Sequence, residues 1–331
     1  MSDITPPVAI PAPARLLVPV VLAVVAGVGL VPLLTNDPAL RETLFSLLMA
    51  ITLATSVNII TGYTGYVSFG NIVFFGIGGY AAFWLMQFGG LNFVPAALLA
   101  IVPAVAMAVV VGGAVLRLRG AHFALATIGI LAATSAFMSN FPPTGGAVGM
   151  FFDFSVYSVY GGARNAALLA YGAMLLTTLA AIATSYAVRR SRLGLALMTI
   201  REDEDEAMVL GINPPRLKVA AYALSALFPA LAGAAFFFKN GVIEPGQAFD
   251  LTRSIESLVM VALGGLGTVA GPIIGAAAYD LLRSSLITSS SLADYQMSIA
   301  GLLLLVVILF ATTGLVGWLR ARWPRTRRWL E

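Results

Sequence analysis

The chain of 331 residues is 59% hydrophobic and only 10% charged, and its mean hydropathy is +0.93. Soluble domains are about 45–50% apolar and about 25% charged. A soluble chain of this length could not bury so much apolar surface in one core, so the composition excludes an ordinary soluble enzyme and indicates an integral membrane protein. The chain has no cysteine and one histidine, His122, which excludes thiolate nucleophiles and multi-histidine metal sites.

Ten apolar segments predict membrane-spanning helices, each of which needs about 20 mostly apolar residues. They cover residues 15–34, 40–61, 71–88, 93–116, 120–139, 165–188, 217–238, 253–268, 270–286 and 297–316. The first lacks the positive flank of a signal peptide, so we expect it to be retained. The sequence therefore predicts an all-α polytopic fold with a transmembrane domain at 15–316, an N-terminal tail at 1–14 and a basic tail at 317–331.

The basic residues predict the orientation, because loops on the cytoplasmic side carry an excess of Lys and Arg. With both termini in the cytoplasm, fourteen basic residues lie inside: Arg15, Arg117, Arg119, Arg189, Arg190, Arg192, Arg201, Arg216, Lys218, Arg320, Arg322, Arg325, Arg327 and Arg328. Five lie outside: Arg41, Arg164, Lys239, Arg253 and Arg283. This bias predicts ten spans with both ends inside, and it makes 189–216 a cytoplasmic loop.

Residues 61–80 contain six glycines, and hydroxyl and amide side chains stand among the first of them. Irregular backbone within a membrane is tolerated only where protein or a water-filled cavity surrounds it. One interpretation is a broken helix near the middle of the membrane that lines a permeation path; the other is close packing of neighbouring helices. For the first interpretation, the residues that line the permeation path would be Gly62, Gly65, Ser68 and Asn71. The surroundings of Thr127 are the next candidate for the lining of the path.

A second glycine-rich segment, 264–280, repeats Gly267, Gly271 and Gly275 at every fourth position, a spacing that lets two helices approach closely. Its position in the opposite half of the chain from 61–80 suggests an internal repeat. Ionisable groups inside spans are rare and commonly functional. Here Glu256 and Asp280 each stand within a turn of an arginine, Arg253 and Arg283 respectively, so we expect paired charges near the outer edge of the membrane.

The 189–216 loop carries the densest charge in the chain, five consecutive acidic residues at 202–206. The spacing of apolar residues from Leu193 to Leu210 predicts one amphipathic helix. Gly211 would end it in the left-handed conformation, and Pro214 and Pro215 prevent its continuation. An amphipathic helix of this kind favours docking to another protein over a solvated linker.

At this loop the sequence resembles the cytoplasmic segment of permease subunits of ATP-binding-cassette importers in the branched-chain amino-acid family. The family pattern R-E-D-E-x-A-A-x-x-L-G-I is matched at Arg201, Glu202, Asp203, Glu204, Ala207, Leu210, Gly211 and Ile212. Asp205 and Glu206 depart from it, because small or apolar residues are usual there. The segments 62–80, 117–130, 144–146, 254–276 and 301–317 are also similar to the family, although Asn71 stands where a histidine is frequent.

The resemblance implies the longer, ten-helix permease of such an importer, in the bacterial inner membrane. Its partners would be a homologous permease, two ATPase subunits and an external substrate-binding protein. The residues expected to contact the ATPase are Arg201, Glu202, Asp203, Glu204, Ala207 and Gly211. We expect neither cofactor nor enzymatic activity on this chain, since neither lysine lies in a P-loop. A self-contained secondary transporter or channel for small amino acids, amides or urea remains the alternative.

Overall fold

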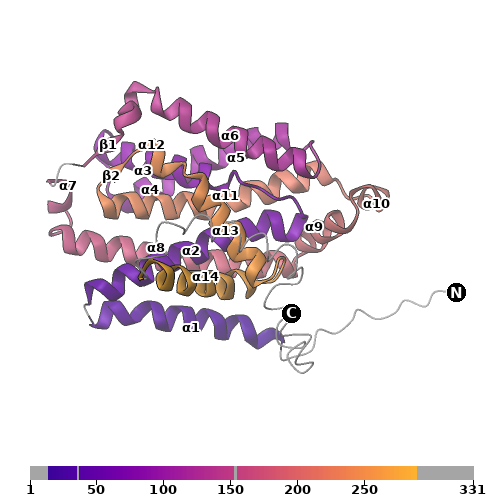
Figure 1. The fold of residues 1–331 in the computed structure, drawn as a ribbon, viewed down its shortest axis with the longest axis horizontal. Helices are drawn as coiled ribbons and strands as arrows, with labels where there is room; N and C mark the ends of the chain where they lie inside the picture. Colours follow the sequence, from indigo (N-terminus) through magenta and orange to yellow (C-terminus); the bar gives the residue numbers. More distant parts are fainter. Residues whose placement is uncertain (1–13, 36, 153–154, 289–331) are drawn as a thin grey trace.

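The computed structural model describes residues 14–35, 37–152 and 155–288, which form a bundle of helices with one short two-stranded sheet (Figure 1). The helices that make up the body are α1 (Ala14–Thr35), α2 (Pro38–Val57), α3 (Asn71–Gln87), α4 (Phe93–Leu99), α5 (Ile101–Val115), α6 (Ala121–Ser139), α8 (Ala163–Arg190), α11 (Pro214–Asn240), α13 (Leu251–Gly264) and α14 (Gly271–Thr288). The shorter elements are α7 (Ser155–Ser158), α9 (Arg192–Glu202), α10 (Glu204–Val209), α12 (Pro245–Ala248), a π-helical turn at Asn58–Gly62 and 3-10 turns at Pro142–Thr144 and Gly146–Val148.

Nine of the ten expected spans coincide with helices, and the tenth, 297–316, lies outside the described residues. The fourth is divided at Ala100 into α4 and α5. Five helical stretches in the described residues are long and apolar enough to cross a membrane: Pro38–Gly62, Phe93–Val115, Ala121–Ser139, Ala163–Arg190 and Pro214–Asn240. The chain is therefore mostly helical, as the sequence predicts.

Helix α11 lies at the centre of the bundle, where it packs against α2, α3, α5 and α8. Glycines let α3 and α11 cross closely. A side-chain carbon on Gly78 would collide with the backbone of Ala230, and one on Gly233 with the carbonyl of Phe75. Small residues at such crossings are the usual means of helix packing in a membrane. In contrast, only 22% of the α6 span is buried, so α6 presents an apolar face outward.

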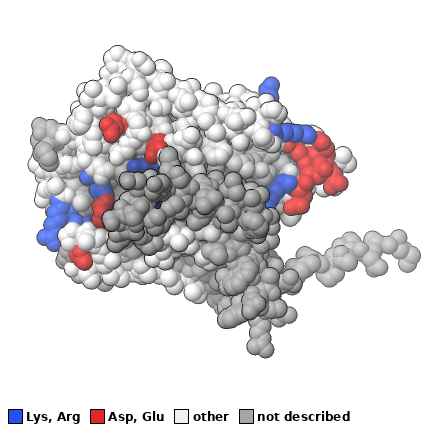
Figure 2. All heavy atoms as spheres, in the orientation of Figure 1, with Lys and Arg blue, Asp and Glu red and all other residues white. Residues whose placement is uncertain are grey.

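The bundle has two different ends (Figure 1). At one end, β1 (Met150–Phe151) pairs antiparallel with β2 (Val242–Ile243); we refer to this as the hairpin end. At the opposite end, which we call the loop end, α9 and α10 of the 189–216 loop project from the helices. The acidic side chains of residues 202–206 gather there, beside several basic ones (Figure 2). Charge is thus concentrated where the loop meets the bundle.

Candidate functional site

The 189–216 loop forms two helices, α9 and α10, and the prediction of one amphipathic helix from Leu193 to Leu210 is wrong. Asp203 has an extended backbone, with φ −154° and ψ 119°, and its carboxylate accepts hydrogen bonds from the amides of Asp205 and Glu206. An aspartate in this position caps a new helix, because it satisfies amides that have no partner in the first turn. The chain therefore turns at Asp203 and begins α10.

Gly211 ends α10 with φ +81°, and the amide of Ile212 donates to the carbonyl of Ala207. The predicted left-handed stop at this glycine is confirmed. The apolar positions of the loop are divided by the turn at Asp203. Leu197 and Ala207 are fully buried, whereas Leu210 is 73% exposed. The loop thus rests on the bundle through α9 and the middle of α10, and leaves the end of α10 uncovered in the isolated chain.

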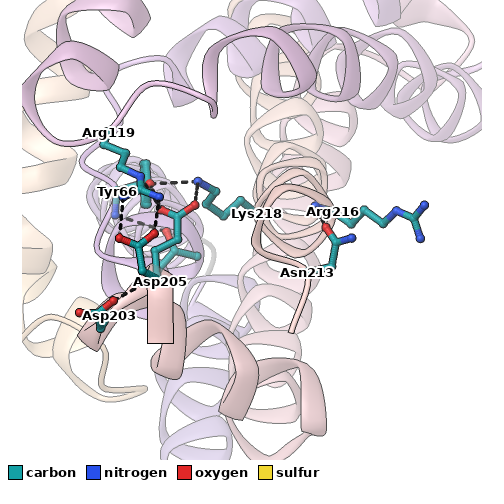
Figure 3. A network of polar contacts seen from close by, with 9 residues as sticks. Tyr66, Arg119, Asp203, Asp205, Asn213, Arg216 and Lys218 are labelled. Carbon is teal, nitrogen blue, oxygen red and sulfur yellow. Dashed lines mark hydrogen bonds and ion pairs between the residues drawn. The ribbon is translucent and has the colours of Figure 1, made fainter. Parts of the chain in front are cut away.

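Glu204 is the centre of a polar cluster that joins the loop to the bundle. Figure 3 labels its partners Tyr66, Arg119 and Lys218. The carboxylate of Glu204 lies 2.7 Å from Lys218 Nζ, 3.7 Å from Arg119 Nε, and accepts a hydrogen bond from the Tyr66 hydroxyl. The Lys218 ammonium also donates to Tyr66 at 2.9 Å and lies 4.3 Å from the centre of its ring. Lys218 is only 2% exposed, so Glu204 supplies the counter-charge that a buried ammonium requires. We call these four residues the Glu204 cluster.

Two opposing influences act on the pKa of Glu204. Burial raises it, but hydrogen bonds from Lys218 and Tyr66 and the charges of Lys218 and Arg119 outweigh burial and hold the pKa below its ordinary value. At the surface, the guanidinium of Arg119 donates two hydrogen bonds to the carboxylate of Asp205, at 2.8 and 3.2 Å, and these bonds lower the pKa of Asp205. Both carboxylates are therefore ionised at neutral pH and tie α10 to the segment between α5 and α6.

Two arginines connect the loop to the two glycine-rich segments. Arg201 Nη1 on α9 donates to the carbonyl of Gly62 at 2.6 Å, and Arg189 Nη1 at the end of α8 donates to the carbonyl of Gly267 at 3.0 Å. The two segments also meet directly, because a side-chain carbon on Gly62 or Gly267 would collide with the backbone of the other. Asn58, in the turn that leads into the first segment, donates to the carbonyl of Thr268 and accepts from the amide of Gly267, both at 2.9 Å. One cluster of bonds thus links the loop with segments about 200 residues apart.

Residues 65–70 interrupt the helices between the π-helical turn and α3, as the sequence predicts. Gly65 has φ +77°. Inside the bundle the interruption is held by Thr127, whose hydroxyl accepts from the amide of Phe69 at 3.1 Å, and by Ser254, which donates to the carbonyl of Phe69 at 2.6 Å. Asn71 begins α3 and is 3% exposed, yet neither the nitrogen nor the oxygen of its side-chain amide has a hydrogen-bond partner in the part of the chain that the structure describes. This polar side chain is buried and unsatisfied.

The predicted site residues divide into an end group and an interior group. Gly62 and Gly65 lie against Arg201 of the loop, and their position near the middle of the membrane stays a prediction. Ser68, Asn71 and Thr127 are buried within the bundle. Among the expected ATPase contacts, Ala207 is fully buried and Glu204 is half-buried, whereas Glu202, Asp203 and Gly211 are exposed. Arg201 is exposed as well, although its guanidinium reaches the carbonyl of Gly62.

Sequence reasoning missed several residues that hold the loop in place, namely Asn58, Tyr66, Arg119, Arg189 and Lys218. One signal was present for Lys218. It stands at the start of an apolar span, where an ammonium needs a partner.

The second glycine-rich segment packs closely, as its spacing predicts: a side-chain carbon on Gly275 would collide with the carbonyl of Met260. The charges beside it pair differently from the prediction. Glu256 lies 3.7 Å from Arg283 Nη1 and accepts from the Tyr279 hydroxyl, and in the described residues Arg253 forms no ion pair within 4.0 Å. The guanidinium of Arg253 instead lies over the rings of Phe75 and Phe236.

Comparison with known proteins places these features in a family. Residues 40–308 match the model of the branched-chain amino acid transport system permease component. The LivM permease proteins of Salmonella typhimurium and Escherichia coli, from high-affinity branched-chain amino acid transport systems, are 27% identical over 80% of this chain and 67% of their own length. The LivH permease of Escherichia coli is 30% identical over 43% of this chain and 46% of its length. No solved structure matches significantly.

Proposed function

Since the chain belongs to the branched-chain amino acid permease family, we propose that it is the membrane subunit of an ATP-driven importer, carrying branched-chain or related hydrophobic amino acids across the inner membrane. It is a multi-pass membrane protein with the apolar helices this requires. Its similarity to LivM and LivH supports pairing with a second, homologous permease. We assign ATP hydrolysis to separate subunits and cargo delivery to an external binding protein, and we place the loop end and both termini in the cytoplasm.

The observation that carries this proposal is the connection between the loop and the glycine-rich segments. A subunit that receives force from an ATPase needs a docking element attached to the parts that move. Here the uncovered end of α10 offers the docking element, and Arg201 and Arg189 hold the carbonyls of Gly62 and Gly267. Contacts of Glu202, Asp203 and Gly211 with the ATPase would then move the loop, and the arginines would pass that motion to both segments.

Within the bundle, we place the cargo path beside Ser68, Asn71 and Thr127. Buried polar groups in native proteins are nearly always hydrogen-bonded, and each exception calls for an explanation. The unpaired amide of Asn71 would serve a cargo that binds and then leaves. Neutral partners such as the hydroxyls of Ser68 and Thr127 suit this task, because a site that held the cargo tightly would stop transport.

The test is a substitution at Gly211, where the open space would accept a side chain but φ +81° would not. Val at this position must adopt a strained backbone, at a cost of about 1–2 kcal/mol. We expect Gly211→Val to insert into the membrane normally, lose copurification with the ATPase subunits and lose ATP-dependent uptake. Gly246→Val is the control, since Gly246 also has open space but no positive φ. Uptake by this chain reconstituted alone would contradict the proposal and favour the secondary transporter.

A further inference from the structure

Arg253 is a half-buried cation, and none of the described residues supplies a hydrogen-bond partner for its Nη1. Its guanidinium carbon lies 4.7 Å from the centre of the Phe236 ring and 5.6 Å from that of Phe75, so two aromatic faces hold the group in place. Its Nη1 is buried and has no hydrogen-bond partner among the described residues. A guanidinium presents parallel N–H groups that match both oxygens of a carboxylate. The two rings therefore fix the guanidinium in a position where its Nη1 could donate to a carboxylate.

The nearby carboxylates are committed to other groups. Asp250 accepts from the amide of Thr252 at the start of α13, at 2.9 Å. Glu256 lies against Arg283 and Tyr279, with its oxygens at 3.7 and 3.2 Å from them. Both acidic residues reduce the cost of burying the Arg253 charge, but neither lies within 4.0 Å of it. Among the described residues, no carboxylate therefore takes the Nη1 donor of Arg253.

Asn71 stands beside this guanidinium. Asn71 and Phe75 are four residues apart on α3, so their side chains lie on the same face of the helix one turn apart. Ser254, which follows Arg253, donates to the carbonyl of Phe69 and so joins the first turn of α13 to the segment that precedes Asn71. Phe75 thus lies next to both groups, one helical turn from Asn71 and with its ring centre 5.6 Å from the guanidinium carbon of Arg253.

We propose that Arg253 and Asn71 bind the two charged ends of a free amino acid, Arg253 taking its carboxylate and the Asn71 carbonyl taking its ammonium, with Phe75 and Phe236 against its apolar side chain. The inference rests on the proposed function. It adds a site in the path where the protein binds the ammonium and the carboxylate on the α-carbon of the cargo. Such a site would accept any hydrophobic amino acid and reject the corresponding amides, because only a carboxylate engages both N–H groups of the fork.

The test uses a photoreactive diazirine analogue of leucine on the importer reconstituted with its partner permease and ATPase subunits. We expect labelling of peptides from 69–76 and 251–256, and competition by excess leucine but not by leucinamide, which lacks the carboxylate. Arg253→Gln should reduce labelling at least tenfold and Arg253→Lys less, since an ammonium keeps the charge without the fork. Arg41→Gln, an arginine substitution at the hairpin end, should label like wild type.

Equal labelling of Arg253→Gln and wild type, no labelling of wild type, or equal competition by leucinamide would each overturn the inference. ATP-dependent leucine uptake in the same liposomes reports the proposed function separately, so the two can fail independently. Should Arg253→Gln fail to assemble, Asn71→Leu provides a second variant. It removes an unpaired polar group, so it should assemble normally, and labelling that survives it would also count against the site.

Discussion

The Glu204 cluster and the interior around Asn71 differ in whether their buried polar groups have hydrogen-bond partners. At the loop end a buried ammonium, a carboxylate, a phenol and a guanidinium satisfy one another. In the interior, the side-chain amide of Asn71 and one nitrogen of Arg253 are buried and have no hydrogen-bond partner within residues 14–35, 37–152 and 155–288. Satisfied buried networks rigidify a structure, whereas unsatisfied groups cost free energy and persist for another reason. On the proposed function, the satisfied cluster would transmit force and the unsatisfied interior would hold cargo briefly.

The largest expected effect follows from breaking the Glu204 cluster. Lys218→Met removes the buried ammonium and leaves Glu204 without its closest counter-charge, which should lower the free energy of unfolding by about 3 kcal/mol. Adding Glu204→Leu should recover part of the loss, because the uncompensated carboxylate is then gone too. Thermal melting of the purified permease in detergent measures both. A double variant less stable than Lys218→Met would show that the two residues do not act as a pair.

A smaller effect is expected from acid. Since the folded-state pKa of Glu204 is below its ordinary value, its contribution to stability is complete above about pH 4.3 and is lost as the pH falls through the lowered pKa. Glu204→Gln should therefore flatten the decline in melting temperature between pH 5 and pH 3 or so. Asp205→Asn is the matched control, because Asp205 is exposed and its pairing is screened by salt. Identical slopes for wild type and Glu204→Gln would contradict the assignment.

The smallest change in stability, with the opposite sign, is expected at Asn71. Replacing an unsatisfied buried amide by an apolar side chain of similar size removes a desolvation cost of about 1–3 kcal/mol. Asn71→Leu should melt at the wild-type temperature or above it, while uptake by the reconstituted importer falls at least tenfold. Ser68→Ala is the comparison, since it removes the hydroxyl that accepts from the Gly70 amide and so should lower the melting temperature. Normal uptake by Asn71→Leu would remove this residue from the path.

The sequence predicts what depends on local composition and misses what depends on contacts across the chain. Apolar length locates the helices, and the glycine at 211 predicts its positive φ, because both are properties of short segments. The turn at Asp203 has a local cause, yet the strong helical pattern on both sides conceals it. Arg201 and Gly62 are 139 residues apart, and Lys218 reaches a tyrosine 152 residues away. No spacing in the sequence indicates that these groups meet.

The central claim is that the loop passes motion to the glycine-rich segments through Arg201. Arg201→Met keeps the apolar stem but removes the hydrogen bond to Gly62. The direct measurement is the ratio of leucine taken up to ATP hydrolysed by the reconstituted importer. We predict that Arg201→Met assembles and hydrolyses ATP at close to the wild-type rate, while the ratio falls at least tenfold. An unchanged ratio in an assembled, hydrolysing complex would contradict the claim.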